Sequence, residues 1–422
     1  MKAKLCLCLA ICLSTVLLTQ AAAPETKAPL NVRSFGATGS GTNKDTAAIQ
    51  KALDACVAAG GGEVLIPAGN YLVGSIVMGS NTTLRFETNA TLTGSPDRED
   101  FPLMNVRWEG EWRQGRRALI FATNATHIAI TGAGSIIGPP LSLAQLRNPR
   151  GPVIIELIEC KDILLDGFSV TYQRLWGIHP TYCSDIIARN LRIRTTQTNG
   201  DGIDVDSCQN LLIEHCDIDA GDDAIAIKSG RGMEAVRIGR PTQNVIIRDC
   251  TLGSSYAGVG IGTEISGGAR NIRVENCAFT HGANGIFIKS RDGRGGFIEN
   301  VTGENLTILG RCGAFLGIDL ITKGIQAAEP VTGDVEQWTA ARNISFKNIK
   351  VEGVPTLIAG RSISPARPLD SLTLSNITGT CQRGITLANV VNADFKDINV
   401  TGYNGALLSL TNVTGTGLEI KN

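Results

Sequence analysis

Aromatic side chains make up only 5% of the 422 residues, and the chain has no excess of charge of either sign. Lysine plus arginine and aspartate plus glutamate number 39 each, so composition provides no broad basic surface for nucleic acid, and an anionic partner must be met locally. The apolar run Leu5–Leu18 is too short for a comfortable membrane span. With 49 glycines and short Ile, Val and Leu runs, the sequence favours many short strands over long helices.

The N-terminus has the layout of a secretory signal peptide. Two lysines precede the apolar run, and small residues follow it as far as Ala23. This layout predicts a signal peptide at 1–23 and a mature chain, 24–422, that is secreted or periplasmic and not attached to a membrane. A retained N-terminal membrane anchor is the less favoured alternative.

Cysteine usage gives no sign of a metal site. Three of the 12 cysteines fall in the predicted signal peptide, so nine remain, an odd number that leaves at least one thiol unpaired or bridging between chains. None of the nine has zinc-binding spacing. Because they lie inside a repeating pattern, we expect buried thiols, one or two disulfides, and no metal or other cofactor.

An imperfect repeat with a period in the twenties runs along the chain. ECKDILLDGFSV, YCSDIIARNLRI and SCQNLLIEHCDI carry Asp162, Asp185 and Asn210, which lie 23 and 25 residues apart, and similar units continue to NADFKDINV. Strands this short cannot bury a face alone and must stack. Alternating aliphatics with Asx corners, and no L-x-x-L-x-L frame, predict an all-β fold, a right-handed parallel β-helix.

One segment has a helical pattern. Residues 45–60, DTAAIQKALDACVAAG, place Ala48, Ile49, Leu53 and Cys56 on one face and end in glycines. We expect this short helix to cap the N-terminal end of the solenoid, which would otherwise expose an apolar rung. The cap region is expected at 24–80, within a single β-helix domain spanning 24–422 that acts as a monomer.

Strand alternation brings three carboxylates together. Aligning GDDAIAIKS with NGDGIDVDS, 22 residues earlier, pairs Ile225 with Ile203 in the core and stacks Asp223 on Asp201, with Asp222 beside them. Burying unpaired carboxylates costs on the order of several kcal/mol each, so we expect these side chains to turn outward into water at the strand entrance. Their repulsion should raise at least one pKa, as a proton donor at neutral pH requires.

The same face continues in the next coils. In GANGIFIKS, Asn284 stands in the column of the second acid of the GDD motif, and Lys289 stands in the column of Lys228. We expect both lysines, with Arg291 or Arg294, to form a basic wall beside the acidic centre. A neutral chain would then hold a local site for an anionic sugar.

These motifs resemble those of glycoside hydrolase family 28, the polygalacturonase and rhamnogalacturonan-hydrolase family. NGD at 199–201 resembles the family's Asn-Thr-Asp motif, and GDD at 221–223 resembles its Gly/Gln-Asp-Asp motif. WGIHP at 176–180 and GTEISGG at 262–268 are similar to segments of bacterial, often exo-acting, members. The opening segment 30–53 resembles the cap of pectin-degrading β-helices. The resemblance covers nearly the whole mature chain, in the family's order.

The resemblance implies an inverting, metal-independent hydrolase of a pectic polysaccharide. It implies that Asp222 protonates the leaving glycosidic oxygen and that Asp201 and Asp223 hold and deprotonate the attacking water, in a site whose acid and base lie far enough apart to admit that water. Substrate contacts are expected from Asn199, Lys289, Lys228, His179, Tyr256, Glu264 and Arg291.

Two positions depart from the family pattern and leave alternatives open. Tyr256 stands where the Gly-His-Gly stretch has histidine, and Phe287 stands where the Arg-Ile-Lys motif has arginine. Because a ring cannot replace the bidentate grip of arginine on a uronate carboxylate, rhamnogalacturonan or a decorated pectin is an alternative to homogalacturonan. Further alternatives are a β-helix polysaccharide lyase and a catalytically impaired, glycan-binding solenoid.

Overall fold

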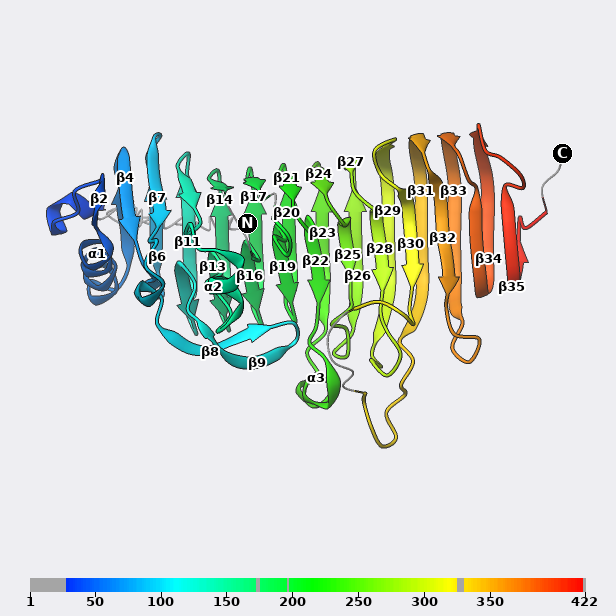
Figure 1. The fold of residues 1–422 in the computed structure, drawn as a ribbon, viewed down its shortest axis with the longest axis horizontal. Coiled ribbons are helices and arrows are strands. Elements are labelled where there is room, and N and C mark those ends of the chain that lie inside the picture. Colours follow the sequence, from blue (N-terminus) through cyan, green and yellow to red (C-terminus); the bar gives the residue numbers. More distant parts are fainter. Residues whose placement is uncertain (1–27, 172–174, 196, 325–329, 420–422) are drawn as a thin grey trace, which may run out of the picture.

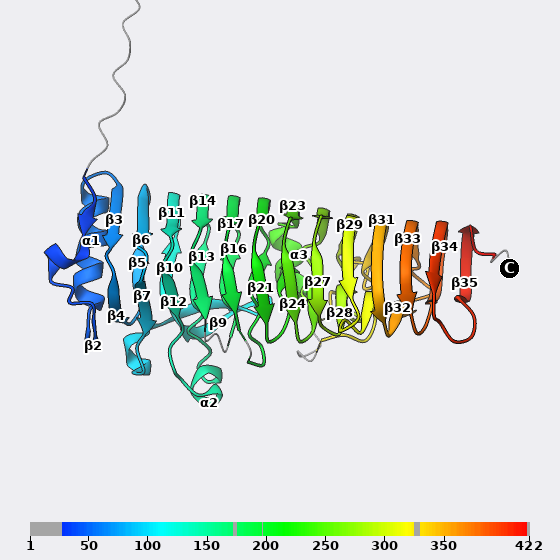
Figure 2. The same ribbon diagram turned by 90° about the horizontal axis from the view of Figure 1, so that it is seen from above.

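The computed structural model describes residues 28–171, 175–195, 197–324 and 330–419, so the predicted signal peptide lies outside the described residues. Within these ranges 33 strands pair in parallel as the chain winds coil upon coil, which gives the elongated solenoid of Figures 1 and 2. The protein is a right-handed parallel β-helix, as the repeat predicts.

The strands form three stacks, each gaining about one strand per coil. The first stack contains β1 (Leu30–Asn31), β3 (Gly62–Ile66), β6 (Thr82–Phe86), β11 (Thr126–Gly132), β14 (Lys161–Asp166), β17 (Ser184–Arg189), β20 (Gln209–Glu214), β23 (Thr242–Arg248), β26 (Ala269–Glu275), β29 (Phe297–Leu309), β31 (Ala340–Val354), β33 (Leu369–Cys381) and β34 (Ile385–Thr401). The second contains β2 (Ser40–Lys44), β4 (Gly69–Val73), β7 (Ala90–Gly94), β12 (Ser135–Ile137), β15 (Ser169–Thr171), β18 (Arg192–Arg194), β21 (Asp217–Ala220), β24 (Thr251–Ser254) and β27 (Ala278–His281). The third, which carries the site, contains β5 (Ile76–Met78), β10 (Ile120–Thr123), β13 (Ile155–Ile158), β16 (Ile178–Thr181), β19 (Ile203–Asp206), β22 (Ile225–Lys228), β25 (Ala257–Ile261), β28 (Asn284–Lys289), β30 (Ala314–Asp319), β32 (Thr356–Ser362) and β35 (Leu408–Thr416). The first residues of β34 lie between β32 and β35 in this stack.

Asparagine ladders form the corners of the coils. Asn210, Asn244, Asn271 and Asn300 all have φ between 56° and 60°, the left-handed conformation that asparagine tolerates. The Nδ2 of each later residue donates to the Oδ1 of the one a coil earlier, at 3.0 Å in all three steps. The Asx positions of the repeat therefore fix both the backbone turn and the alignment of successive coils.

Helix α1 (Thr46–Ala58) lies at the N-terminal end of the solenoid, where it packs on the first coils (Figure 1). Ile49, Leu53 and Cys56 are buried as predicted, whereas Ala48 is only half-buried. The other helical segments are short: η1 (Val32–Phe35), η2 (Arg98–Asp100), α2 (Leu143–Arg147) and α3 (Gly232–Ile238). Among the described residues, no helix has the length and apolar character needed to cross a membrane.

The cysteines are buried core residues without disulfides. All nine of the described cysteines are buried free thiols, so the expected disulfides are wrong. The reason is their place in the coil: the backbone N–H groups of Cys160 and Cys183 donate to the Sγ atoms of Cys183 and Cys208, both at 3.3 Å. These thiols act as small apolar corner residues that bond to the neighbouring backbone.

An antiparallel hairpin that the repeat does not predict leaves the solenoid after β7. Its strands β8 (Leu103–Trp108) and β9 (Glu111–Arg116), cyan in Figure 1, run beside the coils toward α3. Trp108 stacks on Trp176, with ring centroids 4.0 Å apart. They belong to an apolar cluster outside the main core that also includes Ala118, Phe121, Leu141, Leu146, Val153, Ile158 and Leu175.

Candidate active site

A pocket of about 270 Å³ opens on the outer face of the third stack. Its walls are formed by Glu109, Trp176, Asn199, Asp201, Asp222, Asp223, Lys228, Tyr256, Gly262, Thr263, Glu264, Lys289 and Gly324. Eight of the ten predicted site residues are therefore together in one cavity. His179 and Arg291 are not among its walls.

The strand register that assembles this pocket is the one that the alternation predicts. Ile203 pairs with Ile225, and the backbone N–H of Gly202 donates to the carbonyl of Asp223 at 3.0 Å, which places Asp201 beside Asp223. Because each strand starts two residues after its acid, the coils present the carboxylates at the strand entrance. The pocket thus results from aligned sequence positions in consecutive coils.

The acids are less exposed than predicted. Asp201 is 4% exposed and Asp223 is 2% exposed, so the expectation of open, wet positions is wrong for both. The physical reason is that each finds a buried lysine: Lys289 Nζ lies 2.6 Å from Asp223 Oδ2, and Lys228 Nζ lies 3.6 Å from Asp201 Oδ2. A carboxylate paired with a lysine can be buried at lower cost than an unpaired one. Asp222, in contrast, is half-buried.

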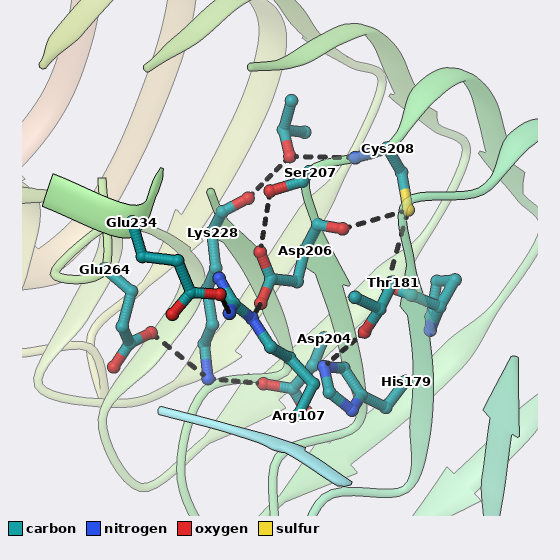
Figure 3. A network of polar contacts seen from close by, with 12 residues as sticks. Arg107, His179, Thr181, Asp204, Asp206, Ser207, Cys208, Lys228, Glu234 and Glu264 are labelled. Carbon is teal, nitrogen blue, oxygen red and sulfur yellow. Dashed lines mark hydrogen bonds and ion pairs between the residues drawn. The ribbon is translucent and has the colours of Figure 1, made fainter. Parts of the chain in front are cut away.

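Lys228 lies at the centre of a cluster of buried charges. Its Nζ lies 2.6 Å from Asp204 Oδ1 and 3.7 Å from Glu264 Oε2, as Figure 3 shows, and 3.6 Å from the ring centroid of Trp176. The predicted basic wall does not form, because both lysines are paired with acids and Arg294 is only 1% exposed.

Asp204 belongs to the site although the sequence reasoning missed it. It is fully buried and faces outward from the core, since it alternates with Ile203 and Val205 and pairs with Ala226 in the next coil. The same alternation that assigned Lys228 to the outer face could have assigned Asp204 to it. Its contact with Lys228 makes it the nearest counter-ion of that lysine among the described residues.

Burial raises the pKa values of three acids of the site, Asp201, Asp204 and Asp222. Burial, followed by the charge of Asp223, raises the pKa of Asp222 above its ordinary value. Burial and the neighbouring Asp204 raise the pKa of Asp201, and burial raises the pKa of Asp204 itself to about 7. Asn199 Nδ2, 3.4 Å from Asp222 Oδ2, favours the charged form of Asp222 and so limits its rise.

His179 and Arg291 lie behind the pocket walls. His179 is fully buried, with its ring edge toward Trp176 and its Nδ1 3.8 Å from Glu156 Oε1, and burial holds its pKa well below the ordinary value. Arg291 Nη1 donates to the carbonyl of Gly324, a wall residue, at 3.4 Å. Both residues are placed to support walls of the pocket.

The tip of the β8–β9 hairpin supplies a wall that sequence reasoning missed. Glu109 lines the pocket, and Gly110 packs so closely that an added Cβ would lie 2.9 Å from the Arg231 nitrogen and 3.1 Å from Glu264 Cγ. Gly110 also has a φ of 81°, which favours glycine. WEGEWR is a hairpin-like stretch, but no local pattern indicates which distant coil its tip will contact.

Buried ion pairs hold the hairpin in place. Arg107, which is 1% exposed, donates to Asp206 Oδ2 and to Glu234 Oε1, each at 3.2 Å, and Arg231 pairs with Glu111 (Figure 3 shows the first two). Asp206 follows Asp204 on β19, so the strand that carries the charge cluster also anchors the hairpin. The hairpin tip is therefore a fixed wall of the pocket.

Comparison with known proteins agrees with this architecture. Residues 56–354 match the family model of Glycosyl hydrolases family 28. A probable polygalacturonase of Vitis vinifera is 30% identical over 82% of this chain and 72% of its own length, and an exo-poly-alpha-D-galacturonosidase of Dickeya chrysanthemi is 25% identical over 69% and 56%. The exopolygalacturonase structure from Thermotoga maritima superposes with a TM-score of 0.77 at 25% identity, covering 87% of this chain and 92% of that one. The relatives come from both plants and bacteria. The chain belongs to glycosyl hydrolases family 28 and is a glycoside hydrolase.

Proposed function

We propose that the protein is a secreted, inverting hydrolase of a pectic polysaccharide, with Asp222 as general acid and Asp201 and Asp223 as the groups that activate water. One observation carries the proposal: the three carboxyls line one pocket but differ in environment. Asp223 Oδ2 lies 2.6 Å from Lys289 Nζ, whereas burial raises the pKa of Asp222. The polygalacturonase names of the relatives support a pectic substrate.

The proposed reaction is a single displacement. Asp222 gives its proton to the glycosidic oxygen as the bond between that oxygen and the anomeric carbon breaks. A water molecule held by Asp201 and Asp223 attacks the same carbon from the opposite face and passes its proton to this pair, which inverts the configuration. Exchange with solvent then returns a proton to Asp222 and removes the proton that the Asp201–Asp223 pair has gained. No cofactor is required, which agrees with the family resemblance.

The pH dependence of kcat/KM tests these assignments. Asp222 must be protonated, so activity is expected to fall as pH rises through its raised pKa. Replacing Asn199 by alanine removes a hydrogen bond that lowers the pKa of Asp222, so the alkaline limb should move to higher pH. Rate profiles from about pH 3 to about pH 9 measure this shift; an alkaline limb that stays in place, or moves down, contradicts the role of Asp222.

We also propose that the enzyme removes sugars from a chain end. On the N-terminal side of the pocket, the hairpin tip at Glu109 and the cluster around Trp108, Phe121 and Trp176 fill the outer face of the coils. On the C-terminal side, past Tyr256, the surface is hollow. A chain can therefore extend from the pocket in one direction, which supports exo cleavage.

Product analysis checks substrate and mode together. Incubated with separated homogalacturonan, rhamnogalacturonan and oligosaccharide fractions, the enzyme is expected to release small sugars from an acidic fraction while viscosity falls slowly. Reducing ends, product sizes and viscosity are followed over time. A rapid fall in chain length would overturn exo cleavage, and products that absorb as unsaturated sugars would indicate a lyase.

A second candidate substrate follows from Phe287. This ring is 5% exposed and occupies the position where the family motif has arginine, so rhamnogalacturonan or a decorated pectin stays an alternative to homogalacturonan. We further propose that 24–422 acts as one domain, as a monomer outside the cell, after loss of residues 1–23.

A further inference from the structure

A second hollow of about 540 Å³ adjoins the catalytic pocket and shares Tyr256 with it. This volume lies within the range of about 300 to 1,000 Å³ that is typical of small-molecule sites. It lies over β28, β30 and β32, further along the third stack. Its position is on the open side of the catalytic pocket, where a bound chain would continue.

One outward-facing column of the third stack explains why the hollow exists. Gly260, Phe287, Gly317 and Ala359 pair in sequence from coil to coil. Phe287 is the one large side chain of these four. The residues that follow it in the column, Gly317 and Ala359, are small, so they form a low floor at the bottom of the hollow. At Gly317 an added Cβ would lie 2.4 Å from Asn284 Oδ1 and 3.0 Å from the Phe287 ring, so only glycine lets both side chains lie across this coil.

Phe287 separates the two cavities. Its ring centroid lies 5.6 Å from that of Tyr256, 5.7 Å from Lys289 Nζ and 5.8 Å from Lys323 Nζ. Lys289 belongs to the catalytic pocket, whereas Lys323 lines the second hollow. The ring therefore lies near one lysine of each cavity, lines only the second hollow, and offers no grip on a carboxylate.

The rim of the second hollow is cationic, and part of that charge is available to a ligand. Lys323, Arg361 and Arg383 line it, together with one acidic residue, Asp319. Asp319 accepts hydrogen bonds from the backbone of Ile321 and from the backbone and hydroxyl of Thr322, and its Oδ2 lies 3.9 Å from Lys323 Nζ. Arg361 is exposed and forms no ion pair with any described residue. Arg383 donates to a threonine hydroxyl of the same rim at 2.7 Å.

We infer that the second hollow binds an acidic sugar unit of the polysaccharide, beyond the unit held at the catalytic acids, with Arg361 as the main ligand of its carboxylate and Lys323 beside it. The ring of that sugar lies against the low floor of Gly317 and Ala359. The inference rests on the proposed function, because it takes the chain being cleaved as the ligand. It specifies that chain further: an ionised uronate, in place of its methyl ester, is required in the second hollow.

Arg361→Gln tests the inference. With unesterified oligogalacturonides long enough to reach the second hollow, the variant is expected to raise KM about tenfold, or about 1.4 kcal/mol of binding, with kcat within about twofold. Methyl-esterified oligomers should already bind the wild type weakly and should respond little to the substitution. Arg361→Lys should recover part of the loss because it keeps the charge but not the planar fork.

Arg367→Gln is the matched control, since Arg367 is exposed nearby and lies outside the hollow. Equal KM values for Arg361→Gln and Arg367→Gln would overturn the inference while leaving the proposed hydrolysis intact. Calorimetric titration of each substitution combined with Asp222→Asn, using the same oligogalacturonide, reads the site without cleavage. If the chain bound in an Arg361-dependent way but was not cut, the proposed function would fail and the binding site would stand.

Discussion

Asp222→Asn is expected to lower kcat on a pectic oligosaccharide by about 10³-fold to 10⁴-fold, with KM changed by less than about threefold. Asparagine keeps the shape of the side chain but has no proton to give to the leaving oxygen. Because Asp222 is half-buried and its nearest hydrogen-bond partner is Asn199 at 3.4 Å, the substitution leaves no buried charge without a partner. Steady-state kinetics and thermal unfolding of the same preparation separate lost chemistry from lost folding.

Asp219→Asn is the control for this loss. Asp219 lies on β21, in the same coil, and its exposed carboxylate contacts His281 at the surface, 3.2 Å away. Its substitution should leave kcat unchanged. A substrate with a good aryl leaving group needs little protonation and should restore activity to Asp222→Asn but not to Asp223→Asn. Equal kcat values for Asp222→Asn and Asp219→Asn would show that Asp222 is not the acid.

The features that sequence could predict are those that repeat. Alternation at Ile203 and Ile225 sets which side chains face the core, and the Asx corners such as Asn244 and Asn271 set where each coil turns. Each signal is local, and the same signal recurs in one stacked coil after another. The register that brings Asp201 beside Asp223 follows from these two signals alone.

The features that sequence could not predict depend on contacts between distant segments. The hairpin tip at Glu109 reaches the pocket because Arg107 pairs with Asp206, 99 residues away along the chain. Nothing in the sequence pattern of the hairpin itself indicates that Arg107 will pair with so distant a residue. The low exposure of the acids likewise depends on which lysine meets which carboxylate, and a charge count for one face cannot assign such pairs.

Lys228→Met is expected to lower the free energy of unfolding by about 3 to 5 kcal/mol at neutral pH. The ammonium is 5% exposed and lies among Asp204, Asp201 and Glu264, so its removal leaves several buried carboxylates without their counter-ion. Methionine retains much of the side-chain volume beside Trp176, which limits the packing loss. Urea unfolding measures the difference from wild type.

Lys161→Met is the control, because Lys161 is exposed on β14 and its Nζ lies 3.8 Å from Asp185. Its loss should therefore cost no more than about 0.5 kcal/mol.

The pH dependence of the stability deficit of Lys228→Met, its loss of unfolding free energy relative to wild type, identifies the cause of that deficit. Burial raises the folded pKa of Asp204 to about 7 even beside the lysine, and without the lysine that pKa rises further. A carboxyl whose folded pKa is raised costs least when it is protonated, so the deficit should be smaller near about pH 5 and should grow as pH rises above about 7. A deficit equal to that of Lys161→Met, or independent of pH, would show that Lys228 does not neutralise the buried acids and that the cluster of buried charges around it is held together in another way.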